Sequence, residues 1–177
     1  MEKIFFREEQ HFGRWWLWLI LLTATVGSTL PFIYGIYSQE VLGIPWGNHP
    51  TNTTVLIAIL VVDSLVVGSL CFLIAKMKLI VEIRKDGIWY KYPPLYSKWR
   101  NIKKEEIERF EIRKYNPVTE YGGWGIKGRR KNRVLNTSGN IGLQLYLKDG
   151  SKLLLGTFQK QAIEYATEKM MNKENSV

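Results

Sequence analysis

Hydrophobic positions divide the chain into two long apolar runs and a second half in which apolar and polar residues alternate. The first run covers residues 15–37 without a charged residue, and the second covers residues 55–75 with one, Asp63. At about 1.5 Å per residue, each run makes a helix of roughly 30 Å, the thickness of the hydrocarbon core of a bilayer. The pattern therefore predicts two transmembrane helices.

Basic residues flank these runs unequally, and this predicts an orientation. The N-terminal segment 1–14 carries three Lys and Arg residues, the connecting loop 38–54 carries none, and residues 76–91 carry five. By the positive-inside rule, both termini are cytoplasmic and the loop is extracytoplasmic. We therefore expect a multi-pass protein of the cell membrane, with its second helix over residues 55–77 and its largest part, residues 78–177, in the cytoplasm.

Asp63 lies near the middle of the second run and is followed by Ser64. An ionised carboxylate at that depth costs about 3 kcal/mol or more, so we expect it to be protonated, paired or turned toward another helix. Thr23 and Thr25 of the first run are candidate partners. Two interpretations stay open: a hydrogen bond that holds two helices or two protomers together, or a proton or ion relay.

The period changes to two from residue 79 onward. Alternation predicts strands over residues 79–84, 88–92, 107–115, 141–147 and 152–156. Two Asp-Gly pairs between strands are typical of tight hairpin turns. Residues 159–172 lack Gly and Pro, which favours a closing helix. The apolar face expected for that helix contains Ala162, Ile163, Ala166 and Met170. We therefore expect six or seven antiparallel strands followed by one helix.

Several stretches of the second half carry a family resemblance. They are Lys114–Pro117, Glu120–Ile126 and Asn136–Leu145, together with the opening Phe6–Gln10. In these stretches the chain resembles bacterial membrane proteins that join two N-terminal transmembrane helices to a pleckstrin-homology-like (PH-like) domain. The resemblance implies an α+β membrane protein, with an antiparallel PH-like barrel or sandwich capped by a C-terminal helix. It implies fold and topology but no activity.

Positive charge is concentrated in the expected cytoplasmic domain. Residues 78–177 hold 21 Lys and Arg against 11 Asp and Glu, a net charge of +10, while the whole chain carries +9. Five bases fall within seven residues: Lys127, Arg129, Arg130, Lys131 and Arg133. Such a run attracts anionic lipid headgroups by about 1 kcal/mol per base. The alternatives are a solvated hairpin tip and another acidic partner; we do not expect nucleic acid, because the domain is tethered and no recognition helix is evident.

The glycine-rich turn formed by Gly122, Gly123, Trp124 and Gly125 is a second candidate site. Glycines permit close backbone approach, and an exposed Trp124 would serve as a recognition anchor. Such turns also form bulges at the corners of β structures, with the aromatic side chain packed inward.

Residues for catalysis or metal binding do not form a readable set. The sequence shows no Ser-His-Asp combination and no paired carboxylates in a readable pocket, and His11, His49 and Cys71 lack metal-ligand spacing. We therefore expect no enzyme activity, no metal and no cofactor. The sequence predicts a membrane-anchored PH-like binding or assembly module at the inner leaflet. Its expected partners are anionic lipid headgroups, another membrane protein or a second copy of the chain. The alternative is a small transport or channel accessory subunit that uses Asp63.

Overall fold

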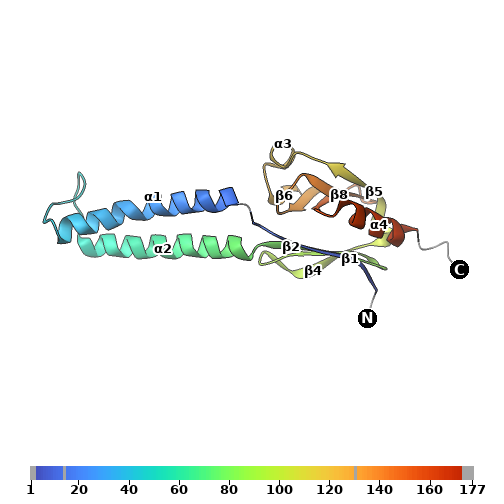
Figure 1. The fold of residues 1–177 in the computed structure, drawn as a ribbon, viewed down its shortest axis with the longest axis horizontal. Helices are drawn as coiled ribbons and strands as arrows, with labels where there is room; N and C mark the ends of the chain where they lie inside the picture. The colour runs from blue at the N-terminus through green and yellow to red at the C-terminus, as the bar shows by residue number, and fades with distance from the viewer. Residues whose placement is uncertain (1–2, 14, 130, 173–177) are drawn as a thin grey trace. The chain divides into compact units, whose positions relative to one another are not determined.

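A computed structural model describes residues 3–13, 15–129 and 131–172, and the chain divides into two units. One unit contains two long helices, α1 (Trp15–Glu40) and α2 (Thr53–Lys76). The other is an α+β domain built from residues on both sides of these helices (Figure 1). The helical unit is thus an insertion within the β domain.

The two helices form an antiparallel hairpin in which both are long and apolar enough to cross a membrane. At 26 and 24 residues they are about 39 and 36 Å long. They extend beyond the predicted spans, so the connecting loop shortens to residues 41–52. The extra turn of α1 is held by Ser38, whose hydroxyl donates to the Ile44 carbonyl and whose carbonyl accepts from the Ile44 N–H.

The β domain contains two sheets. The first is antiparallel, in the order β1-β2-β3-β4, with bounds Ile4–His11, Lys78–Arg84, Gly87–Tyr92 and Tyr96–Lys103. The second has the order β5-β8-β9-β7-β6. Its bounds in chain order are Ile107–Lys114 (β5), Gly125–Arg129 (β6), Asn132–Asn136 (β7), Ile141–Leu147 (β8) and Lys152–Gly156 (β9). A short 3-10 helix, Lys104–Glu106, joins the sheets. Helices α3 (Pro117–Tyr121) and α4 (Lys160–Met171) complete the domain.

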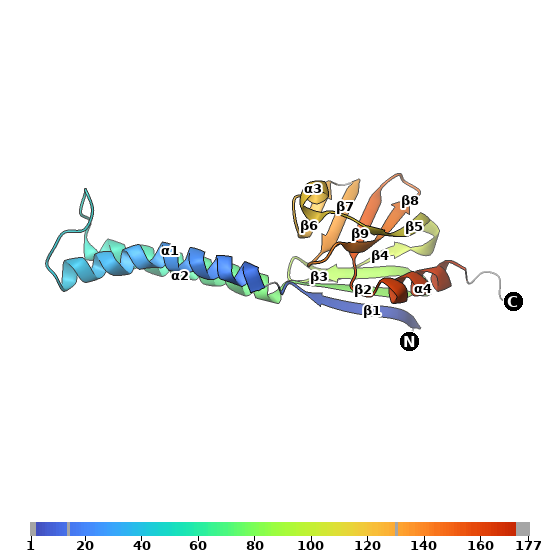
Figure 2. The same ribbon diagram turned by 45° about the horizontal axis from the view of Figure 1, so that its top comes forward.

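The sheets pack face to face, and α4 lies against both (Figure 2). Alternate residues of each sheet enter the shared core, including Ile83 and Ile88 from the first and Leu143 and Leu145 from the second. Helix α4 adds Ile163, which is fully buried, and contacts β1 and β2 as well as β5 and β8. The strict alternation along β8 therefore reflects one face turned toward the core.

Four expectations need correction. The described residues form nine strands in place of the six or seven expected. The strand pairs of the described residues form two sheets rather than a closed barrel, and the pairing is not wholly antiparallel because β7 and β9 run parallel. The buried face of α4 includes Thr167 in place of Ala162, which is exposed. Ile163, Ala166, Thr167 and Met170 follow one another at intervals of one to four residues around one face, and Ala162 lies about 100° from Ile163, at the margin of that face.

Strand β1, for which the sequence analysis predicted no element, is the edge strand beside β2. Its inward positions are Phe6, Glu8 and Gln10, so polar residues occupy places where alternation normally shows apolar ones. The Glu8 carboxylate accepts from the Thr157 hydroxyl at 2.6 Å and from the Phe158 N–H at 2.8 Å. These contacts connect β1 to the segment between β9 and α4.

Gln10 makes a second connection between the sheets. Its amide nitrogen donates to the Gly156 carbonyl at 2.7 Å, and its oxygen accepts from the Thr137 hydroxyl at 3.1 Å. Because all of these groups are buried, their partners cannot be replaced by water without rearrangement. The segment that precedes the first apolar helix is therefore part of the core of the β domain.

We predict that a chain starting at residue 78 does not fold cooperatively. It loses the buried Phe6 side chain and four side-chain hydrogen bonds. Together these are worth about 5 kcal/mol, which is comparable to the stability of a small domain. A chain in which Asn-Gly replaces residues 13–76 should fold, because Phe12 donates to the Met77 carbonyl and a two-residue turn can close this pair. Urea unfolding followed by circular dichroism compares the two; equal midpoints would contradict the role of β1.

Candidate functional site

A line of polar residues crosses the outer face of the second sheet. Cross-strand pairs connect Arg109 to Tyr146, Tyr146 to Lys152, Lys152 to Asn132, and Asn132 to Arg129. These five residues, one from each strand, are called the cationic row below. Paired residues share one face of a sheet, and strands lie about 4.8 Å apart, so the three cations follow one another at intervals of about 10 Å.

Tyr146 lies between two of these cations. The Arg109 guanidinium is 3.5 Å from the centre of the Tyr146 ring, and the Lys152 ammonium is 5.3 Å from it. The Tyr146 hydroxyl donates to Glu111 at 2.6 Å, and this hydrogen bond raises the pKa of Tyr146. Arg109 also forms an ion pair with Glu111 at 3.7 Å. Tyr146 is thus held in place by the cations beside its ring and by the carboxylate that accepts from its hydroxyl.

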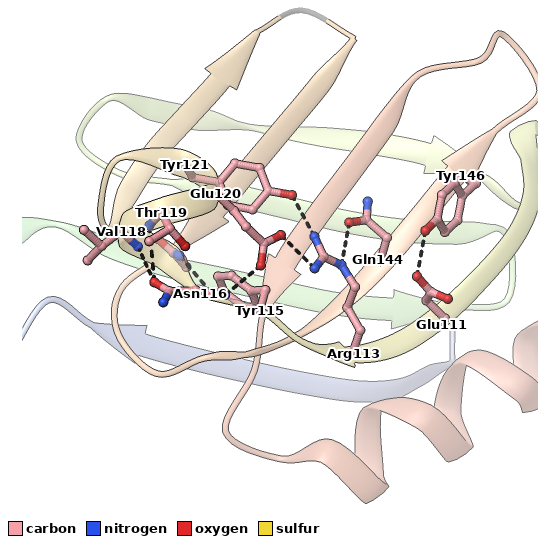
Figure 3. Close-up of polar contacts among 11 residues, drawn as sticks. Glu111, Arg113, Tyr115, Asn116, Val118, Thr119, Glu120, Tyr121, Gln144 and Tyr146 are labelled. Carbon is pink, nitrogen blue, oxygen red and sulfur yellow. Dashed lines mark hydrogen bonds and ion pairs between the residues drawn. The ribbon is translucent and has the colours of Figure 1, made fainter.

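Next to the row is a polar cavity of about 450 Å³. Its lining consists of Arg113, Gln144, Tyr146, Asn132 and Lys152 from the sheet, with Glu120 and Tyr121 from α3. Figure 3 shows Arg113 reaching three of these neighbours. Its guanidinium donates to Gln144 at 3.2 Å, to Glu120 at 2.8 Å and to the Tyr121 hydroxyl at 3.0 Å. The hydrogen bonds of Arg113 therefore hold the side chains of the cavity wall in place.

Helix α3 exists because its five residues are capped at both ends. The Asn116 side chain accepts from the Val118 and Thr119 N–H groups, and Pro117 occupies the first position of the helix. Gly122 ends the helix in the left-handed conformation, at φ 73°. Residues 116–117 are thus the start of a helical turn that places Glu120 and Tyr121 over the sheet.

A small apolar cluster fixes this turn to the sheet. Tyr121 packs edge-on against Tyr115, with ring centres 6.0 Å apart, beside Val134 and Leu154. Burial raises the pKa of the Tyr115 hydroxyl, which accepts from the Asn136 amide at 2.8 Å. The Asn136 oxygen in turn accepts from the Gly125 N–H. One buried asparagine therefore joins the base of α3 to the start of β6.

The predicted basic run is the β6–β7 hairpin. Gly128 permits its turn, because a Cβ atom there would lie 2.1 Å from the Asn132 carbonyl oxygen and φ is +88°. Lys127, Arg129 and Lys131 are exposed, while Arg130 lies outside the described residues. Register places Lys127 opposite Val134 and Arg129 opposite Asn132, on the outer face.

Arg133 belongs to the opposite face of the same hairpin. Burial raises the pKa of the Tyr90 hydroxyl on β3, and the charges of Arg100 and Arg133 oppose this rise. Arg133 is therefore near the space between the sheets. The described members of the predicted basic run therefore do not share one face, because side chains alternate along a strand.

The glycine-rich turn follows α3 directly. Gly122 is the helix cap described above, and Gly123 and Gly125 also have positive φ. The half-buried Trp124 donates its indole N–H to the Gly139 carbonyl at 3.1 Å. The turn thus joins α3 to β6 and rests on the segment between β7 and β8.

The outer face of the first sheet differs in its charge balance. Glu82 is buried and forms ion pairs with Arg7 at 3.1 Å and Arg84 at 2.6 Å. Lys91 lies 4.4 Å from the centre of the Trp99 ring. The main cations of that face are therefore paired with an acid or stacked on an aromatic ring. In contrast, no ion pair between described residues involves Arg129 or Lys152 of the cationic row.

Asp63 contacts the first apolar helix through a residue that the sequence analysis did not name. Ser28 Oγ lies 3.1 Å from Asp63 Oδ2 and 3.1 Å from the Thr25 carbonyl. The expected partners Thr23 and Thr25 instead donate to carbonyls of their own helix, as hydroxyls in helices commonly do. Ser64 follows Asp63 in α2. The Ser28 contact joins the two helices, which favours the structural interpretation of Asp63.

Comparisons with protein-family models, with curated proteins and with solved structures find no match to this chain. The resemblance to PH-like membrane proteins therefore stays a prediction.

Sequence reasoning missed Arg109, Asn132, Tyr146 and Lys152 as site residues. The only indication in the sequence was the polar residues that alternate with apolar ones along β8 and along its partner strand β5. That signal indicates an outward side chain, but it does not reveal which residues of distant strands become neighbours.

We predict that Glu120 makes the stability of the β domain depend on acid pH. The hydrogen bond from the Asn116 N–H, and then Arg113, lower the pKa of Glu120 below 4.5. Stability is therefore full above about pH 4.5 and falls as pH drops through the lowered value. At pH 7 the Glu120→Gln variant should melt below the wild type by less than about 5 °C, because the pair is partly exposed. The difference should shrink as pH falls through the lowered pKa of Glu120, whereas Glu108→Gln, at an exposed carboxylate, should show none at any pH. A Glu120→Gln difference of the same size at pH 7 and in strong acid would contradict this assignment.

We predict that the Ser28 contact tolerates an amide but not an apolar side chain. In Asp63→Asn, the new N–H group can donate to Ser28 while the serine hydroxyl donates to Thr25. In Asp63→Leu the contact is lost, which costs about 1 kcal/mol in a membrane helix pair. Thermal denaturation in detergent should leave the Asn variant near the wild type and lower the midpoint of the Leu variant. Equal midpoints for all three chains would remove the interhelical role.

Proposed function

We propose that the chain is a membrane-anchored binding module, whose β domain contacts anionic lipid headgroups at the inner leaflet through the β6–β7 hairpin. The observation that carries the proposal is the exposure of Lys127, Arg129 and Lys131 at one hairpin. No ion pair between described residues neutralises these three side chains. Each such base near an anionic surface contributes about 1 kcal/mol.

Chain connectivity supports a location close to the bilayer. Three residues separate the end of β1 from the start of α1, and one residue separates α2 from β2. Three residues span at most about 11 Å. If the two apolar helices cross the membrane, the β domain cannot move far from the surface at which they end. The tether thus raises the local concentration of the hairpin at the lipid headgroups.

The proposal includes orientation and architecture. The excess of Lys and Arg outside the loop favours cytoplasmic termini. Two packed sheets followed by a C-terminal helix support a PH-like sandwich, in keeping with the resemblance described above. Residues 11 and 78 are cross-strand partners, so they require the same side of the membrane for both ends of the helical hairpin.

We predict that anionic lipid slows hydrogen exchange in the hairpin. The full chain is reconstituted in nanodiscs of phosphatidylcholine, with or without phosphatidylglycerol. At low salt, residues 125–136 should exchange several-fold more slowly in the anionic discs. The difference should disappear in 1 M salt, because screening reduces the Debye length to about 3 Å.

Two matched double variants make the test specific. Lys127→Gln with Lys131→Gln removes two hairpin charges, which corresponds to about 2 kcal/mol of attraction, or roughly 30-fold in equilibrium. Lys98→Gln with Lys160→Gln removes two exposed charges elsewhere on the domain. Only the first should lose the effect of anionic lipid. Equal exchange in neutral and anionic discs would overturn the electrostatic contact and leave a protein partner or a second copy as the interpretation of the hairpin.

A further inference from the structure

The cavity beside the cationic row has the volume and the fixed polar side chains of a small-ligand site. At about 450 Å³ it falls within the range of small-ligand pockets. Two tyrosines, Tyr121 and Tyr146, contribute walls that are fixed by their own contacts. The wall is also preformed at Arg113, where three hydrogen bonds fix the guanidinium. A ligand would therefore meet a shaped site without having to order it.

The charge of the lining selects the charge of the ligand. Arg113 and Glu120 neutralise each other at 2.8 Å. Lys152 has no ion pair with a described residue, and its ammonium lies beside the Tyr146 ring, 5.3 Å from its centre. The lining therefore has one unpaired positive charge. A ligand with a single negative charge compensates it, whereas a second negative charge would share the cavity with the carboxylate of Glu120.

The polar groups beside Lys152 select the shape of the anion. Asn132 is the cross-strand partner of Lys152 and lines the same cavity, and no hydrogen bond of its side chain is present among the described residues. A phosphate oxygen can accept from an ammonium and from an amide together. The carboxylate of Glu120 has lone pairs beyond those that its two partners use, so it can accept from ligand hydroxyls.

We infer that this cavity binds a hydroxylated phosphodiester, with the phosphate at Lys152 and Asn132 and the hydroxyls toward Glu120. A phosphodiester carries one negative charge at neutral pH, unlike a phosphate monoester. The ligand is either the headgroup of an anionic phospholipid or a soluble diester of the same chemistry. The cavity lies on the same sheet face as the cations of the β6–β7 hairpin. Only the lipid origin of the ligand rests on the proposed function.

The experiment uses the full chain in phosphatidylcholine nanodiscs, with saturation-transfer NMR on added soluble compounds. Glycerophosphoglycerol is the phosphodiester probe, glycerol 3-phosphate is the monoester and glycerol is the uncharged control. We expect transfer to the diester, at least threefold weaker binding of the monoester, and none of glycerol. Lys152→Gln should weaken diester binding at least tenfold, and Lys152→Arg should restore most of it. Lys98→Gln, the same change on β4, should have no effect.

A second arm identifies the source of the ligand. In discs that contain phosphatidylglycerol and no soluble compound, slower exchange of residues 142–147 and 152–154 that Lys152→Gln abolishes would support the lipid source. Diester binding without that protection would support the soluble source. Either outcome sustains the inference. It is overturned if the diester does not bind, or if it binds equally well to the wild type and to Lys152→Gln.

The two proposals fail separately. The Lys127→Gln, Lys131→Gln double variant should lose protection of the hairpin by anionic lipid but keep diester binding, since neither residue lines the cavity. Lys152→Gln should show the reverse. Loss of both properties in both variants would mean that one diffuse positive field explains them, and this would overturn the cavity as a distinct site.

Discussion

The pairing of β1 with β2 is the constraint on which the rest of this structure depends. The strand before the first apolar helix and the strand after the second are neighbours in one sheet, with His11 opposite Lys78. This pairing brings the two ends of the helical insertion together, because β1 precedes α1 and β2 follows α2. If the helices cross a bilayer, they must therefore cross it as a pair. The same strand contributes Glu8 and Gln10 to the core, so the closure is also part of the folded β domain.

The use of polar groups in that core gives the closure its specificity. Burial of one face already specifies the register of β1, and Glu8 adds two donors, the buried Thr157 hydroxyl and the part-buried Phe158 N–H, that a shifted register would leave unpaired. Gln10 adds a donor and an acceptor on the second sheet. The position of β1, and with it the point at which the chain leaves the domain toward α1, is thus set by hydrogen bonds to β9 and to the segments that follow β7 and β9.

The pattern of apolar and polar residues predicted those elements in which every residue of one face meets the same kind of surroundings. The apolar runs predicted α1 and α2, and the alternation Leu143, Leu145, Leu147 predicted β8 because one side of that strand faces the core. Strand β1 was missed because Glu8 and Gln10 occupy inward positions. The strands of the β6–β7 hairpin were not predicted, and a hairpin tip was only one interpretation of the basic run, because glycines and cations obscure the alternation of apolar and polar residues. The parallel pairing of β7 with β9 depends on chain reversal through β8, which no short window of sequence contains.

The candidate site was missed for a different reason, because it depends on register across the sheet rather than on pattern along a strand. Arg109, Lys152 and Arg129 are separated by 20 residues or more in sequence, and they share a line only because five strands pair in the order that the structure shows. Composition located the positive charge in this domain but not its distribution. On the first sheet Glu82 pairs with Arg7 and Arg84, and on the second Arg109 pairs with Glu111 and Arg113 with Glu120. No ion pair between described residues involves Lys152 or Arg129. An excess of charge forms a candidate site where cations lack acidic partners, and on this face those cations are Lys152 and Arg129.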